Sequence, residues 1–162
     1  MFRVAPCVSQ LGLTSLLLLA TSLVSLGCDE PNSLTGSITD SHDLGFDTVR
    51  LRLLTDQQAY ELRYDKALAG GSQDIVAKVV FDVPADGVTV DDTLDLLSLS
   101  GQVERITAKN DPFPAVQRAD LTFNAGGVDH NDATSGAWGA TFDNGKTING
   151  TFEVSLEYAS FE

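Results

Sequence analysis

The feature that most constrains this chain is a strict alternation of apolar and polar residues near its C-terminal end. One face of the run carries Ile148, Gly150, Phe152, Val154, Leu156 and Tyr158, and the other carries Thr147, Asn149, Thr151, Glu153, Ser155 and Glu157. Successive side chains of a β-strand point to opposite faces, so this period of two predicts a strand in a sheet that is covered on one side.

A second alternating run precedes this strand and predicts a hairpin. Trp138, Ala140 and Phe142 alternate with small residues, and the dipeptide Asn144-Gly145 stands between the two runs. Asn-Gly favours a type I′ turn, because both central residues of that turn need a positive φ. We therefore predict an antiparallel pair over residues 138–158, with Phe142 and Phe152 on the covered side.

The middle of the chain repeats the same pattern. A run over 48–53 and a run over 60–65 predict a hairpin, in which Arg50 or Arg52 pairs across the strands with Glu61 or Asp65 on the solvent face. Further strands are predicted over 75–83, which alternates least and should be central, over 102–108 and over 118–123. Residues 89–98 are interpreted as a loop or a short turn of helix.

These strands predict an all-β domain. After the first 28 residues no long stretch has helical periodicity, and the strands are separated by turn residues. The expected fold is an antiparallel β-sandwich or barrel of about seven to nine strands.

The N-terminal segment has the composition of an export signal. Arg3 precedes an uncharged, apolar stretch over residues 11–26, which as a helix spans about 24 Å, less than the bilayer core of about 30 Å. The stretch ends in Ser25-Leu26-Gly27-Cys28, a small residue followed by cysteine. This ending resembles the lipobox of bacterial lipoproteins, although Ser25 stands where leucine is usual in that family.

The resemblance implies how the chain is processed. It implies a signal peptide over 1–27, acylation of Cys28 by palmitate or similar chains, a short tether over 28–33 and a single β-domain over 34–162. The expected location is the bacterial cell envelope, anchored to either the inner or the outer membrane through Cys28. Cys7 would leave with the signal, so no disulfide could form within the mature chain.

The charge of the chain excludes one class of partner. The sequence has 10 Lys and Arg against 23 Asp and Glu, a formal charge of −13, and removal of Arg3 with the signal would leave −14. Nucleic-acid binding needs clustered basic residues to neutralise phosphates, so no nucleic-acid partner is expected.

No catalytic arrangement stands out, so we expect a protein that is not an enzyme and uses no cofactor. The chain has two histidines, His42 and His130, neither lies in a nucleophile motif, and acylation would occupy the only cysteine of the mature chain. A carboxylate-dependent hydrolase remains an alternative, but with 23 acidic residues some neighbouring pair is inevitable.

One loop contains candidate metal ligands. Asp129, Asn131 and Asp132 lie together after Gly126-Gly127, and clustered hard oxygen ligands suit Ca²⁺. The next alternate position is Ala133, and no glutamate follows to complete a calcium shell. The pattern therefore favours a solvated turn over a metal site.

The primary functional hypothesis is a lipid-anchored envelope protein whose β-domain binds a protein, glycan or small ligand, or serves structurally. The alternative is a lipocalin-like barrel that carries an apolar ligand in a cavity lined by Trp138 and Phe152. The sequence favours ordinary core positions for these two aromatic residues.

Overall fold

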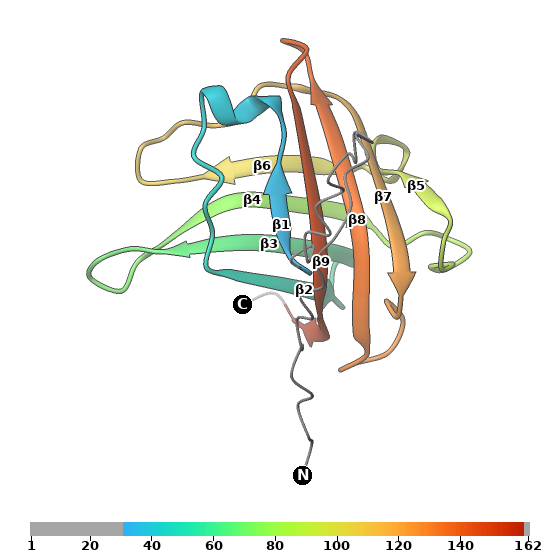
Figure 1. The fold of residues 1–162 in the computed structure, drawn as a ribbon. Helices are drawn as coiled ribbons and strands as arrows, with labels where there is room; N and C mark the ends of the chain where they lie inside the picture. Colours follow the sequence, from blue (N-terminus) through green and yellow to red (C-terminus); the bar gives the residue numbers. More distant parts are fainter. Residues whose placement is uncertain (1–30, 161–162) are drawn as a thin grey trace, which may run out of the picture.

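The computed structural model describes residues 31–160, in which the chain forms a curled, mixed sheet that resembles a half-barrel (Figure 1). The strands are β1 (Ser33–Thr35), β2 (Thr48–Leu54), β3 (Ala59–Ala67), β4 (Gln73–Asp82), β5 (Thr93–Asp95), β6 (Gln102–Ile106), β7 (Val116–Ala125), β8 (Ala133–Phe142) and β9 (Thr147–Ala159). Two short 3-10 segments, η1 (Ser37–Asp40) and η2 (Leu96–Leu99), complete the elements of this range. The predicted all-β class and strand number are confirmed. None of the helical segments in residues 31–160 is long and apolar enough to cross a membrane.

The order of strands places β9 at the junction of two sheets. Arranged so that hydrogen-bonded neighbours stand next to each other, the strands follow the order β5-β7-β8-β9-β2-β3-β4-β6, and β1 also pairs with β9. The first half of β9 pairs antiparallel with β1, Ser33 opposite Thr151, whereas its second half pairs in parallel with β2, Leu51 opposite Leu156. We call β5, β7, β8, β9 and β1 sheet A, and β2, β3, β4 and β6 sheet B. The predicted antiparallel arrangement is therefore correct except at the β2–β9 contact.

The C-terminal hairpin forms as predicted, but its turn differs. Phe142, Phe152 and Ile148 are at most 1% exposed, and Trp138 lies opposite Gly150. Gly145 has a φ of 77°, whereas Asn144 is not among the described residues with positive φ. The amide of Gly145 donates to the Phe142 carbonyl, and the amide of Phe142 to the Lys146 carbonyl, both at 2.9 Å. The type I′ prediction is wrong, because a three-residue loop needs only one residue with positive φ.

The sheets enclose a core of aromatic rings, and two glycines make room for it. The ring of Phe123 meets Phe152 edge-on at 6.0 Å, and Tyr64 lies 6.1 Å from Trp138. A Cβ at Gly150 would overlap the Trp138 indole, and one at Gly136 would lie 2.6 Å from the Phe152 ring. Glycine at these two strand positions therefore permits the rings to pack against the sheet.

The predicted β2–β3 hairpin forms, with Arg52 opposite Glu61 and Arg50 opposite Arg63, and it carries cross-strand ion pairs of the predicted kind. Arg50 contacts Asp65 at 2.5 Å, and Arg52 lies 3.9 Å from Glu61. One prediction is wrong: the side chain of Asp65, expected on the solvent face, is 0% exposed. A register shift between Tyr64 and Asp65 and a second guanidinium, Arg63 at 2.8 Å, enclose it.

The remaining predicted strands are also present. β4 is central, between β3 and β6, and both Val76 and Ala77 on its opposite faces are buried. Residues 89–98 were expected to form a loop or a short turn of helix; the start of η2 agrees with this, but the short strand β5, which pairs with β7, was not predicted. Ser33, assigned from the sequence to the tether, already lies in β1.

Candidate functional site

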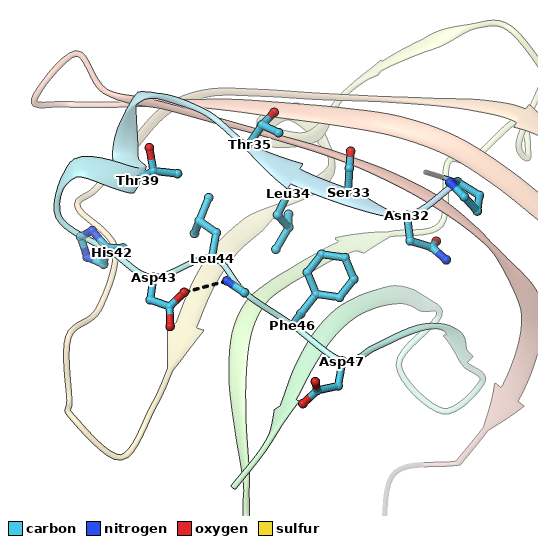
Figure 2. Close-up of a pocket in the computed structure, with 12 residues that line it drawn as sticks. Asn32, Ser33, Leu34, Thr35, Thr39, His42, Asp43, Leu44, Phe46 and Asp47 are labelled. Atoms are coloured by element: carbon cyan, nitrogen blue, oxygen red, sulfur yellow. Dashed lines mark hydrogen bonds between the residues drawn. The ribbon is translucent and has the colours of Figure 1, made fainter. Parts of the chain in front are cut away.

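An open groove lies between β1 and the segment 39–47 that returns from η1 to β2. Its volume is about 890 Å³, and its walls are residues 31–35 and 42–47 together with Thr39. Figure 2 shows Leu34, Leu44 and Phe46 directed toward one another across the groove, with polar side chains around them. The site therefore combines an apolar floor with a polar rim.

A glycine produces the turn that opens this groove. Gly36 has a φ of 137°, and a Cβ there would overlap the Thr147 carbonyl of β9. The chain can therefore leave β1 against β9 only with glycine at this position. Ile38 in η1 is 0% exposed and ties the turn to the core, so the segment after it has to return across the end of the half-barrel.

A buried arginine holds the returning segment in place. Nη1 of Arg105, on β6, donates to the Asp43 carbonyl at 3.0 Å and to the Val76 carbonyl at 3.2 Å. Its guanidinium lies 5.9 Å from the centre of the Phe113 ring. Nε of Arg105 is 3.3 Å from the Asp111 carboxylate but lacks hydrogen-bond geometry, so this contact is an ion pair and not a hydrogen bond. The Thr107 hydroxyl, with help from Arg105, lowers the pKa of Asp111.

One acidic group at the rim, Asp43, is held ionised by its neighbours. Asp43 accepts from Lys66 Nζ at 2.7 Å and from the Gly45 amide at 2.9 Å, a bond drawn in Figure 2. The hydrogen bonds from Lys66 and from the Gly45 amide lower the pKa of Asp43. The carboxylate of Asp43 in turn raises the pKa of Lys66. Asp47 accepts from the Ala67 amide at 2.7 Å. Because its pKa is lowered, the Asp43 carboxyl is poorly suited to act as a general acid near neutral pH.

The histidine of the groove is also engaged. Nδ1 of His42 lies 2.9 Å from the Ser41 hydroxyl, and Nε2 lies 3.4 Å from the Pro112 carbonyl. The imidazole sits 5.4 Å from the Phe113 ring. These contacts fix the loop 41–45 against the loop before β7, and the Ser41 hydroxyl is the side-chain group that contacts the imidazole nitrogen.

The loop that holds the candidate metal ligands, in which the sequence favoured a solvated turn, is held by hydrogen bonds within itself and to β9. The Asp132 carboxylate accepts from the Asp129 amide at 3.0 Å, and the Asn131 amide donates to the Leu156 carbonyl at 2.7 Å. His130 accepts from the Tyr158 amide at 3.1 Å. Within residues 31–160 no group of three or more His, Cys, Asp or Glu side chains could hold a metal ion.

The two aromatic residues proposed as cavity lining belong to the packed core. Trp138 is 3% and Phe152 1% exposed, and Trp138 Nε1 donates to the Tyr64 hydroxyl at 3.1 Å. That hydroxyl donates in turn to the Thr151 carbonyl at 2.8 Å, and burial raises the pKa of Tyr64 so that it stays protonated. The core interpretation is therefore supported over the cavity-lining one.

The sequence pattern did not predict the groove. Residues 34–47 contain no long alternation, and the one available signal was Gly36 between two apolar positions, Leu34 and Ile38. Arg105 was placed on a strand but not in the core, because a single charged residue in a short run does not reveal its burial. The predicted lipidation site, Cys28, lies outside the described residues.

Comparison of the chain with protein-family models, with curated proteins and with solved structures found no match.

Proposed function

We propose that this protein is a lipoprotein of the bacterial cell envelope, anchored through acylated Cys28, whose β-domain binds a partner without catalysing a reaction. The observation that carries the proposal is the sequence Ser25-Leu26-Gly27-Cys28 at the end of an apolar stretch, five residues before β1 begins at Ser33. A signal of this kind, placed directly before a folded domain, is typical of lipid-anchored proteins.

The short connection supports a role close to the membrane. The five residues from Asp29 to Ser33 would span at most about 18 Å if fully extended. Residues 31–35 form one wall of the groove, so an anchored domain would hold the groove within that distance of the anchored cysteine. The formal charge of −14 expected for the mature chain would oppose close contact with anionic lipids.

A binding role has more support than the two alternatives. The carboxylate with a shifted pKa in the groove, Asp43, is shifted toward ionisation, which does not favour a hydrolase that needs a protonated acid. A lipocalin-like carrier needs an internal cavity, whereas Trp138 and Phe152 pack against Tyr64 and Phe123. Neither alternative therefore has a specific observation in its favour.

Radiolabelled palmitate tests the anchor in cells that express the chain. We expect the wild type to incorporate label and to sediment with membranes, and Cys28→Ser to lose the label. Cys7→Ser is the matched control, because Cys7 lies in the expected signal peptide and its loss should leave labelling unchanged. Label retained by Cys28→Ser, or lost by Cys7→Ser alone, would overturn the assignment.

A further inference from the structure

The strand β1 has one paired edge and one free edge. Within residues 31–160 it pairs with β9 alone. The amide of Thr147 donates to the Ser37 hydroxyl at 2.9 Å, and the amide of Glu153 donates to Oδ1 of Asn32 at 2.8 Å. Main-chain groups of a strand alternate between its two edges, so the odd-numbered residues of β9 between these two direct theirs toward β1.

The same alternation places the main-chain groups of Leu34 on the free edge. Leu34 lies opposite Gly150, an even-numbered residue of β9, while the two neighbours of Leu34 lie opposite odd-numbered residues. At such a position of an antiparallel pair, the amides and carbonyls of the two facing residues point away from each other. The amide and carbonyl of Leu34 therefore point away from β9, toward the groove that Leu34 lines, and neither has a partner within residues 31–160.

The opposite wall of the groove also carries unpaired main-chain groups. Among the described residues, no main-chain hydrogen bond joins β1 to the segment 43–46, and this segment belongs to no strand. Leu44 is only 7% exposed, yet its amide and carbonyl have no partner in residues 31–160. Buried main-chain groups need hydrogen-bond partners, so both walls are suited to a ligand that brings a row of donors and acceptors of its own.

Apolar side chains lie between the two walls. Leu34, Leu44 and Phe46 point toward one another in Figure 2. The ring of Phe46 meets the ring of Tyr64 edge-on at 5.1 Å, so contact with the core fixes its position. Successive side chains of an extended peptide point to opposite sides, so every second side chain of a peptide in the groove meets this apolar floor.

The charged side chains that line the groove, Asp43 and Asp47, are both acidic. The Asp43 side chain is 64% exposed although Lys66 contacts it, and Asp47 accepts a hydrogen bond from the Ala67 amide. The formal charge of the whole chain, −13, has the same sign. Complementary charge steers association and disfavours wrong partners, so this rim favours a basic ligand.

We propose that the groove binds an extended, basic peptide segment of a partner protein, which adds as a strand to the free edge of β1. In such strand addition the main chain supplies affinity and alternate side chains supply specificity. The apolar side chains of the peptide contact Leu34 and Phe46, and its basic side chains lie at the acidic rim. The inference rests on the binding role proposed above and does not depend on acylation of Cys28.

Titration of the full chain in detergent, followed by amide chemical shifts, tests the site directly. The probe is the capped peptide Ac-Lys-Val-Lys-Val-Lys-Val-Lys-amide. We expect saturable shifts concentrated on β1 and on the segment 42–47. No saturable shift, or shifts that leave these residues unmoved, would overturn the proposal.

Two altered peptides separate strand addition from attraction by charge. N-methylation of the three valines removes the amide donors along one edge of the probe and keeps its charge, and it should weaken binding at least tenfold. Replacement of every lysine by glutamate keeps the donors and reverses the charge, and it should also weaken binding at least tenfold. Equal affinity of the N-methylated peptide would rule out strand addition, and equal affinity of the acidic peptide would rule out a basic ligand.

Two variants of Leu34 test the main-chain edge from the side of the protein. Both shorten the side chain, but Leu34→Ala keeps the amide and Leu34→Pro lacks it, a change that an edge strand tolerates where the amide points away from the sheet. Leu34→Pro should bind the probe about two- to twelvefold more weakly than Leu34→Ala. Gln102→Ala, at an exposed position of the edge strand β6, is the control and should leave the affinity unchanged.

The same spectra report whether each variant is folded. Equal affinities of the two folded Leu34 variants would contradict the role of the β1 edge, and if Leu34→Pro does not fold, the N-methylated peptide decides. Peptide binding by a chain that takes up no palmitate would overturn the anchor alone. A palmitate-labelled chain that does not bind the probe would overturn the groove site alone.

Discussion

The outer faces of the two sheets arise from the same alternating pattern but are built in opposite ways. Sheet B covers its outer face with long charged side chains that pair with one another, among them Arg52 with Glu61 and Lys78 with Glu104. Sheet A covers the middle of its outer face with short polar residues and leaves a trough there. A binary pattern predicts which face meets water, whereas the length and charge of the side chains determine whether that face is closed or open to a ligand.

The charged side chains on the outer faces of the two sheets differ in how much of their surface is exposed. On sheet B the side chains of Arg63 and Glu61 are 19% and 14% exposed, because their neighbours cover them. On sheet A the Arg118 side chain is 73% exposed although it too is paired. The outer face of sheet B therefore satisfies its own charges and contributes to stability, and that of sheet A keeps its polar groups available.

The largest expected effect contrasts the two sides of sheet A. Phe152→Ala removes a fully buried ring that meets Phe123, and it should lower the free energy of unfolding by about 3 to 5 kcal/mol. Thr151→Ala, one residue away on the outer side, should lower it by less than about 1 kcal/mol. Urea denaturation followed by the fluorescence of Trp138, the single tryptophan, measures both. Equal losses would mean that the alternation does not separate a buried face from a wet one.

The next effect compares the two outer faces directly. Asp65→Ala leaves Arg50 and Arg63 without their shared carboxylate, and because these guanidiniums are partly exposed we expect a loss of about 2 to 3 kcal/mol, below that of a fully buried pair. Asp120→Ala breaks the exposed pair with Arg118 and should cost less than about 1 kcal/mol. The two variants are compared by urea midpoint at one ionic strength. A larger loss of stability from Asp120→Ala than from Asp65→Ala would contradict this expectation.

The smallest expected effect on stability concerns the rim of the groove, where the ion pair between Asp43 and Lys66 is exposed. The folded-state pKa of Asp43 is lowered from 3.8, so its stabilising contribution is present above that pH and is lost as the pH falls through the folded-state value. The pKa of Lys66 is raised from 10.5, so the contribution is also lost as the pH rises above that range. Asp43→Asn should therefore be slightly less stable than the wild type between about pH 4 and pH 10, and the difference should shrink as the pH falls through the lowered folded-state pKa of Asp43. Thermal unfolding across an acid pH series checks this, and a difference that does not shrink with falling pH would point to a cause other than charge.

Local pattern predicted much of the fold, because alternation is a property of neighbouring residues. The faces of β8 and β9 and the β2–β3 hairpin followed from a period of two, and the central position of β4 followed from apolar residues on both of its faces. The parallel contact between β2 and β9 did not follow, because the choice of partner strand depends on residues about 100 positions apart, such as Leu51 and Leu156. The turn at Asn144 failed for a related reason: the Asp143 amide bonds to the distant Ala115 carbonyl at 2.8 Å.

The candidate site and the trough on sheet A were harder to predict than the strands. The groove depends on Gly36 lying against Thr147 and on Arg105 reaching the Asp43 carbonyl, two contacts between segments far apart in the sequence. The trough depends on which strands flank β8, and the sequence alone did not indicate that Thr122 and Thr151 stand on either side of Ala137. Burial of Asp65 likewise required a register shift that no local pattern signals.

The position of β9 also constrains how the molecule reaches its folded state. The 13 residues of β9 pair with β8 and, in successive parts of the strand, with β1 and then β2, and the Ser33–Thr151 hydrogen bond joins residues 118 positions apart. Contacts this distant require a large loop to close before they contribute, so domains that depend on them fold slowly. Neither sheet can be joined to the other until β9 has been synthesised. A nascent chain of this topology can form its local hairpins early, but it closes its core only after β9 has been made.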